Sequence, residues 1–261
     1  MRLYVVDAFT DTAFAGNSAG VVLLERPADP AWMQSVAAEL MYAETAFVEI
    51  GDGIDAAGSL PLRWFTPTTE VDLCGHATLA TAHVLGGDRV FRTRGGELRC
   101  TAADGWVTMD FPGDPSTQVA DDVAKAVTGA LPGATVAHVL RGKFDLVAVL
   151  ADAAEVRALN PDFAAILGLD ARLLAVTAPG DRPGIDFVSR AFAPAVGIDE
   201  DPVTGSLHCT LAPYWSAELG RTELVGEQAS ARGGIVRVEA RGDRIGLAGQ
   251  AVTVLTGELH V

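Results

Sequence analysis

The stretch TPTTEVDLCGHATLATAHVL, residues 66–85, decides how the chain folds. Its second half is apolar almost all round, and it begins at Gly75 and ends before Gly86. A helix that is apolar on every side must be enclosed by the rest of the fold. The stretch GSLHCTLAPYW, which begins at Gly205, has the same character. The chain therefore predicts two enclosed helices, each of which starts at a glycine.

The segments that lead up to these two helices also match in order. In each half a strand-like run is followed by a helix signal and then by two more strand-like runs, so that Phe65-Thr66-Pro67 corresponds to Phe192-Ala193-Pro194. Self-similarity of this kind indicates two copies of one unit. We therefore predict an α+β fold of two pseudo-symmetric domains, each a β-barrel-like sheet wrapped round a central helix.

Composition narrows the class of protein. The 261 residues are 49% hydrophobic, which is ample for a buried core, and the formal net charge is −15. Such a charge repels nucleic acid and anionic membrane surfaces, so we expect neither as a partner. No apolar run is long enough to span a membrane, and three widely spaced cysteines include no C-x-x-C pair. We expect a cytoplasmic protein with reduced thiols.

The starts of the two enclosed helices point to the kind of ligand. Unpaired backbone N–H groups at a helix N-terminus attract carboxylates and oxyanions. If the two halves face one another, both helix starts open on the same cleft. We therefore expect a small carboxylate-bearing substrate to bind there.

Two residues of the first half stand out as candidates for chemistry. His76 lies in the first turn of the first enclosed helix, where it can orient a carboxylate or move a proton. A capping or core histidine is the plain alternative. Glu44 lies in the half-buried strand pattern AETAFV, where a charge is costly unless it is used or paired. An edge-strand glutamate that points to solvent is the plain alternative for this residue.

The acidic stretch before the second enclosed helix offers further candidates. We interpret Asp199 and Glu200 as part of a solvated acidic loop near the helix start. Asp201 differs, because Pro202 stiffens its backbone and indicates a fixed role. Ser206 can offer a hydroxyl and a backbone N–H to an anion, although a serine at a helix start is often only a cap.

Metal and nucleotide chemistry find little support in the sequence. His76, His83 and His208 could be imagined as a cluster with an aspartate, but no H-E-x-x-H or other ligand spacing occurs. A G-x-S-x-G elbow and a phosphate-binding glycine pattern are also missing. We expect neither a metal site nor a cofactor.

At these residues the chain resembles the phenazine-biosynthesis-like (PhzF-like) family, within the group that has the diaminopimelate epimerase fold. The resemblance covers nearly the whole chain and is carried by several ordered motifs. They are VDAFTDTAFAGNSAGVVLL, YAETAFV, RWFTPTTEVDLCGHATLATAHVL, DEDPVTGSLHCTLAPYW and GQAVTVLTGEL.

The resemblance implies a cofactor-free isomerase that shifts a proton in a small carboxylate-bearing metabolite. It implies Glu44 as the general acid and base, with His76 and Asp201 beside it. The residues it implies around the substrate are Cys74, Gly75, Gly205 and Ser206. We expect domains at residues 1–113 and 114–248, with the segment 249–261 returning to the first, and the family allows a homodimer.

Two alternatives stay open. The wider group's epimerases use one thiol from each domain, and Cys74 resembles the first of these. Thr204 takes the equivalent place in the second half, and Cys209, one helical turn further on, reads as a core residue. A thiol-dependent epimerase or racemase is therefore the second reading, and a non-catalytic small-molecule-binding protein is the third.

Overall fold

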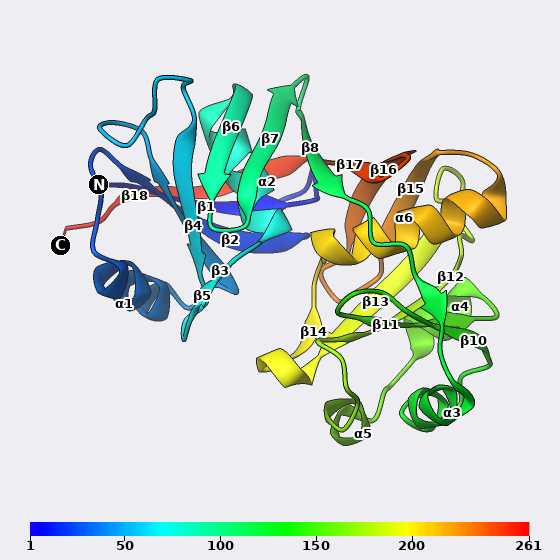
Figure 1. The fold of residues 1–261 in the computed structure, drawn as a ribbon. Coiled ribbons are helices and arrows are strands. Elements are labelled where there is room, and N and C mark those ends of the chain that lie inside the picture. Colours follow the sequence, from blue (N-terminus) through cyan, green and yellow to red (C-terminus); the bar gives the residue numbers. More distant parts are fainter. Residues whose placement is uncertain (261) are drawn as a thin grey trace. The chain divides into compact units, whose positions relative to one another are not determined.

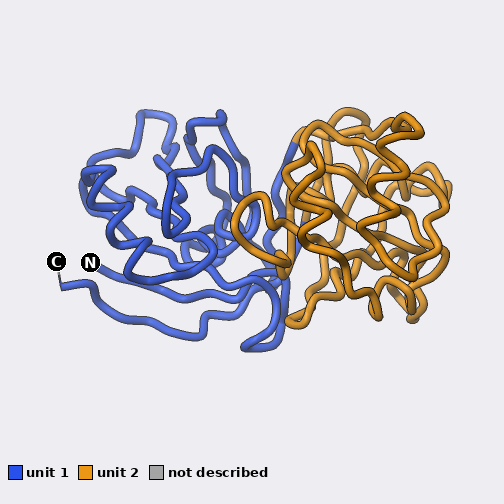
Figure 2. The backbone as a smooth tube through the Cα atoms, turned by 90° about the horizontal axis from the view of Figure 1, so that it is seen from below, with its two compact units in different colours: residues 1–111, 248–261 blue, residues 112–247 orange. Residues whose placement is uncertain are grey.

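The computed structural model describes residues 1–260, which divide into two compact units. The first unit comprises Met1–Phe111 together with the segment from Ala248 onwards, and the second comprises Pro112–Leu247 (Figure 2). Both ends of the chain therefore belong to the first unit, and the second unit is inserted between them in sequence.

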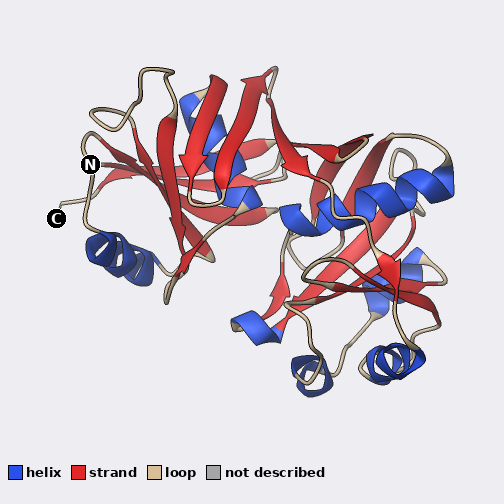
Figure 3. Ribbon diagram, in the orientation of Figure 1, coloured by secondary structure: helices blue, strands red, loops and turns tan. Residues whose placement is uncertain are grey.

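The first unit is rich in strands and contains two helices among its described residues (Figures 1 and 3). Its elements are β1 (Arg2–Ala8), β2 (Asn17–Leu24), α1 (Pro30–Leu40), β3 (Glu44–Glu49), β4 (Leu60–Phe65), β5 (Glu70–Val71), α2 (Gly75–Leu85), β6 (Gly87–Thr93), β7 (Gly96–Ala103), β8 (Trp106–Pro112) and β18 (Ala251–Glu258).

The second unit follows a similar order with additional short helices. Its elements are β9 (Thr117–Gln118), α3 (Asp121–Gly129), β10 (Val136–Arg141), β11 (Leu146–Leu150), α4 (Ala153–Ala158), α5 (Phe163–Leu167), β12 (Leu174–Pro179), β13 (Phe187–Ala193), the 3₁₀ helix η1 (Pro194–Val196), β14 (Ile198–Asp201), α6 (Gly205–Leu219), β15 (Glu223–Gln228), β16 (Gly234–Arg241) and β17 (Arg244–Gly249).

Strand pairing confirms the internal repeat. In the first unit β2 pairs parallel with β3, β3 antiparallel with β4, and β4 parallel with β6. In the second unit β11 pairs parallel with β12, β12 antiparallel with β13, and β13 parallel with β15. Each unit therefore places a long helix, α2 or α6, in the connection between two parallel strands. The sequence predicts the two helices but not this parallel pairing.

The helix α2 is enclosed by the sheet of the first unit. All its residues from 76 to 82 are buried, and it packs against β1, β2, β3, β7 and β18. The approach is close at Gly249, the last residue of β17, which already belongs to the first unit: an added Cβ would lie 2.8 Å from Leu79 and 2.5 Å from Phe9. A position without a side chain lets the backbone lie directly against the helix.

The helix α6 is buried in the same way within the second unit, where it packs against β15 and β16. Pro213 lies inside it and has no N–H to donate to the carbonyl of Cys209, four residues earlier. The backbone N–H of Asp114 donates to that carbonyl instead, at 3.1 Å. Because the carbonyl has this partner, the helix continues through the proline to Leu219.

The helix α1 shows how local sequence sets an element. Asp29 caps its N-terminus by accepting a hydrogen bond from the Ala31 N–H, and Pro30 takes the first helical position. Its buried residues pack with those of neighbouring strands in one cluster, which includes Met33, Phe47 and Phe65. No helix within residues 1–260 is long and apolar enough to cross a membrane.

Candidate functional site

Glu44 is the first residue of β3, in the first unit. Its backbone pairs with Ala19 of β2, and the four residues that follow it in the strand are buried. The side chain of Glu44 retains 21% of its exposure. A strand that begins at the edge of the core therefore presents this carboxylate to solvent at the point where the buried part of the sheet ends.

The start of α2 brings two further side chains to this carboxylate. Cys74 is the N-cap residue of the helix, with extended backbone at φ −144° and ψ 113°, and Gly75 is the first helical residue. His76 follows in the first turn and is buried. Its Nε2 atom lies 3.3 Å from Oε2 of Glu44.

The other nitrogen of the His76 ring has two neighbours. Nδ2 of Asn17 lies 3.4 Å from Nδ1, and Sγ of Cys74 lies 3.6 Å from it. An amide nitrogen can only donate, so Nδ1 accepts and the ring proton is on Nε2. The N–H of His76 is thus on the side of Glu44, although the two are not aligned as a hydrogen bond.

Burial decides the charge state of this histidine. Desolvation lowers the pKa of His76 from its usual 6.5 to about 4, so the ring is neutral at pH 7. A neutral imidazole stabilises a neighbouring carboxylate far less than an arginine or lysine would. The ring of His76 therefore adds no positive charge beside the Glu44 carboxylate.

In the second unit a buried glutamine fixes the turn that carries Asp201. Gln228 accepts a hydrogen bond from the Thr204 N–H at 2.9 Å and donates to the Asp201 carbonyl at 2.8 Å. The hydroxyl of Thr204 in turn donates to Oδ2 of Asp201 at 2.7 Å. Thr204 is the N-cap residue of α6, as Cys74 is of α2, which confirms that the two residues are equivalent in the two halves.

Ser206, in the first turn of α6, lies beside a positive charge. Its hydroxyl accepts a hydrogen bond from Arg172 at 3.0 Å, and Arg172 also binds the buried Asp145 through two nitrogens. Burial lowers the pKa of Arg172, but the hydrogen bond and charge of Asp145, with the charges of Asp201 and Asp114, outweigh this and raise it. The start of α6 thus combines a hydroxyl with a guanidinium.

The interpretation of Asp199 and Glu200 as a solvated acidic loop is wrong for Glu200. The segment forms the strand β14, which pairs antiparallel with β13. This pairing brings Glu200 to Arg190, and the two form a bidentate ion pair at 2.7 and 2.9 Å. Asp199 is exposed.

The predicted residues therefore form two groups, one in each unit. Glu44, Cys74, Gly75 and His76 come together in the first, while Asp201, Gly205 and Ser206 lie round the start of α6 in the second. Sequence reasoning missed Asn17, Arg172 and Gln228, which support these groups. Each contacts residues far away in sequence, and no local pattern marks it.

Potential metal-binding atoms gather in the first group alone, among residues 1–260. A carboxylate oxygen of Glu44, the sulfur of Cys74 and a ring nitrogen of His76 all lie within 4.8 Å of one another. His83 instead contacts the hydroxyl of Thr253, and His208 is buried in the second unit. The histidine cluster weighed in the sequence does not form.

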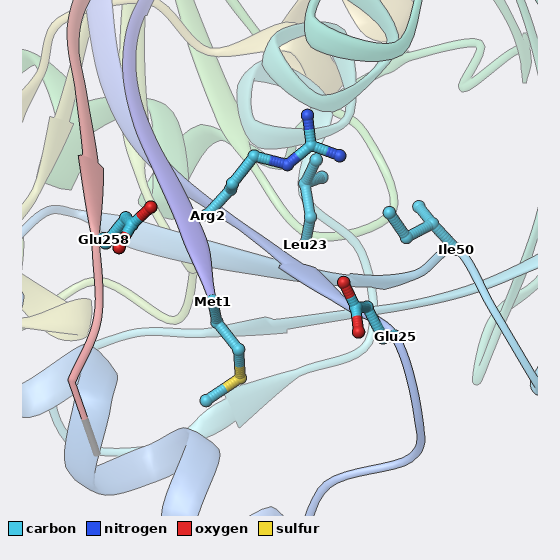
Figure 4. Close-up of a pocket in the computed structure, with 6 residues that line it drawn as sticks. All are labelled: Met1, Arg2, Leu23, Glu25, Ile50 and Glu258. Atoms are coloured by element: carbon cyan, nitrogen blue, oxygen red, sulfur yellow. The ribbon is translucent and has the colours of Figure 1, made fainter.

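A small pocket of about 200 Å³ also opens in the first unit, away from these residues (Figure 4). Its lining consists of Met1, Arg2, Leu23, Glu25, Ile50 and Glu258. Charges of both signs surround it, and none of the residues predicted for chemistry lines it. The pocket gives no reason to place a reaction there.

Comparison with known proteins identifies the family of this chain. A family model described as phenazine biosynthesis-like protein matches residues 6–257. A protein of Halalkalibacterium halodurans described as an uncharacterized isomerase is 43% identical, over 98% of this chain and 97% of its own. The crystal structure of a PhzF family protein from Enterococcus faecalis is 38% identical, covers 100% of this chain and 99% of its own, and superposes with a TM-score of 0.90.

A more distant likeness concerns the fold alone. The structure of a hydroxyproline epimerase from Agrobacterium vitis superposes with a TM-score of 0.59 at 11% identity, over 98% of this chain and 91% of its own. It supports the epimerase-like fold that the sequence predicts. The match of the family model over nearly the whole length decides the assignment. The chain belongs to the phenazine biosynthesis-like (PhzF) family.

Proposed function

We propose that this protein is a cofactor-independent isomerase that moves a proton within a small carboxylate-bearing metabolite, with Glu44 as general acid and base. The description of the Halalkalibacterium halodurans relative as an isomerase supports the reaction class. In the first half-reaction the Glu44 carboxylate takes a proton from carbon, and the electron pair of that bond moves toward a conjugated carbonyl or double bond. In the second, the protonated Glu44 returns the proton to a different carbon.

The observation that carries this proposal is the contact between Glu44 and His76. The carboxylate is partly exposed, so a substrate can reach it, and its neighbour at 3.3 Å is a neutral imidazole. A permanently charged partner holds a carboxylate in the ionised state, whereas a neutral imidazole exerts no such pull. A small rotation of the ring would let its Nε2 proton reach the carboxylate or a substrate oxygen.

Anion binding completes the proposed chemistry. Backbone N–H groups at the start of α2, which begins at Gly75, lie next to Glu44 and His76 and suit a developing negative charge. In the second unit, the proximity of Arg172 to Ser206 supports a role for Ser206 and Gly205 in binding a carboxylate. The roles of Asp201, Gly205 and Ser206 stay predictions.

Isotope exchange tests the proposal directly. The protein is incubated in heavy water with candidate amino acids, hydroxy acids, enamines and dihydroaromatic acids, and deuterium uptake is followed by mass spectrometry. We expect exchange in the wild type and its loss, by about 100-fold or more, in Glu44→Gln.

Glu49→Gln is the matched control, since Glu49 ends the same strand and is partly buried too. If both variants exchange as fast as the wild type, the proposed role of Glu44 is wrong. Thermal-shift hits that bind without any exchange favour a non-catalytic binding protein instead.

A thiol-dependent epimerase is the second candidate, and the position of Cys74 favours it. Its sulfur lies 3.6 Å from a ring nitrogen of His76, at the start of a helix, where a thiolate is stabilised. The equivalent residue in the second unit is Thr204, and Cys209 is buried with its pKa raised to about 12 by desolvation, so a second catalytic thiol is missing from the described part of the chain. We therefore expect Cys74→Ser to lower exchange only slightly, and a loss comparable with that of Glu44→Gln would favour the epimerase.

A further inference from the structure

Three side chains of the first unit bring three different metal-binding atoms together. Glu44 offers a carboxylate oxygen, Cys74 a sulfur and His76 a ring nitrogen, all within 4.8 Å of one another. Two of the residues flank Gly75 at the start of α2, and the third begins β3. Sulfur, nitrogen and oxygen atoms of this kind are the ligands that Zn²⁺ takes in proteins.

The spacing of these atoms suits a tetrahedral ion. Nε2 of His76 and Oε2 of Glu44 are 3.3 Å apart. With bonds of about 2.0–2.1 Å, nitrogen and oxygen ligands of a tetrahedral zinc ion lie about 3.3 Å from one another. The Cys74 sulfur lies 3.6 Å from Nδ1, the other ring nitrogen, and within 4.8 Å of the ligand atoms of Glu44 and His76, so its side chain must turn toward Nε2 to close the set.

An unpartnered atom inside the cluster points independently to a ligand. Nε2 of His76 is buried and has no hydrogen-bond partner among the described residues, which is costly for a polar atom. A metal ion between this nitrogen and Glu44 would satisfy it. The ring proton would then be on Nδ1, where a half-turn of the Asn17 amide presents an oxygen to accept it, and such an outer contact orients a metal-binding histidine.

We propose that Glu44, Cys74 and His76 bind a thiophilic divalent cation of the Zn²⁺ class, and that the bound cation switches the protein off by occupying the carboxylate that acts as base. Three protein ligands leave a fourth position open for water or an anion. Metal binding itself stands on the geometry of the cluster, whereas the inhibition rests on the proposed function.

Cobalt titration tests the binding without reference to activity. Co²⁺ is added to the metal-free protein, and we expect an intense sulfur-to-cobalt charge-transfer band with the visible bands of a four-coordinate ion, saturating at one ion per chain. Cys74→Ser should abolish the charge-transfer band. Glu44→Gln should keep the band and weaken affinity by at least about tenfold, because loss of even an outer-shell partner costs roughly 10–100-fold.

The remaining cysteines provide the matched control. Cys100 is buried and its pKa is raised to about 12 by desolvation, so Cys100→Ser should bind cobalt as the wild type does. Circular dichroism and thermal unfolding show whether each variant is folded, and Glu44→Gln, at a partly exposed position, keeps the test decisive if Cys74→Ser does not fold.

The outcomes separate the two proposals. Absence of a charge-transfer band in the wild type, an unchanged band in Cys74→Ser, or unchanged affinity in Glu44→Gln each overturns the metal site. Binding as expected in a protein that shows no isotope exchange with any substrate leaves the site standing and contradicts the proposed isomerase. Where exchange occurs, one equivalent of Zn²⁺ should abolish it and a chelator should restore it.

Discussion

His208, in the first turn of α6, makes the second unit sensitive to acid. It is fully buried, and its Nδ1–H donates to the Thr204 carbonyl at 2.9 Å. Desolvation lowers the pKa of His208 from 6.5 to about 4, although the hydrogen bond to Thr204 acts the other way. Between these values the unfolded chain binds a proton that the folded protein does not, so the free energy of unfolding falls as the pH drops from about 6.5 to 4.

Replacing this histidine tests the effect. One pKa unit corresponds to about 1.4 kcal/mol, so His208 alone can remove about 3 kcal/mol of stability across the window. We expect His208→Gln, which has no titrating group, to lose less stability than the wild type between pH 6.5 and 4 in urea unfolding. His260→Gln, at an exposed histidine, is the control. Parallel curves for the wild type and His208→Gln would contradict the assignment.

At the level of single residues, the sequence reveals polar residues that interrupt an apolar pattern. Glu44 and His76 stand out because each is polar within an apolar pattern, and the structure places them in contact. Asn17 and Gln228 do not stand out, since polar residues at strand ends are common. Their importance depends on contacts with residues 59 and 24 positions away in sequence, which only the register of the strands creates.

At the level of elements, the end of β15 fixes the turn between β14 and α6. Gln228 is fully buried, and its amide accepts a hydrogen bond from the Thr204 N–H and donates one to the Asp201 carbonyl. Gln228→Leu leaves both backbone groups without these partners inside the protein. A buried polar group without a partner costs about 1–3 kcal/mol, so we expect the free energy of unfolding to fall by about 2 kcal/mol or more.

Thermal and urea unfolding measure this loss. Gln118→Leu is the matched control, because Gln118 is an exposed strand residue and the same substitution there should change stability by less than about 0.5 kcal/mol. Equal stabilities for the two variants would mean that the turn is held by other contacts. A loss confined to Gln228→Leu would identify this side chain as one that stabilises the turn carrying Asp201.

The long elements could be predicted from sequence, but several of the short ones could not. Apolar helices that start at a glycine identify α2 and α6, and an aspartate followed by a proline identifies the start of α1. The helix α4 has six residues, which is too short for helical periodicity to appear. The sequence of β14 resembles an acidic loop. The partner of Glu200 is Arg190 on the neighbouring strand β13, and the sequence does not show that these two strands pair.

At the level of the whole molecule, the two units differ in where one strand of the sheet comes from. The strands β1 and β10 each have two neighbours in the sheet, and one of these neighbours comes from a different part of the chain in each unit. In the first unit β1 pairs with β2 on one side and with β18, from the end of the chain, on the other. In the second unit β10 pairs with β11 and with the short β9, which directly precedes it in sequence. The first unit therefore depends on a strand that is synthesised after the second unit is complete.

This dependence predicts an uneven response to truncation. Ending the chain at Gln250 removes β18 and exposes one edge of β1, whose backbone groups then lack their ladder of hydrogen bonds. Hydrogen exchange followed by mass spectrometry should show β1 and β2 losing protection by about tenfold or more, while β11 and β12, in the core of the second unit, keep theirs.

Replacing Thr253 and Leu255, which are exposed residues of β18, by alanine is the control, since it leaves the backbone ladder intact. Uniform loss of protection across both units would show that the chain unfolds as one cooperative body, and unchanged protection of β1 would show that β18 contributes little to the first unit.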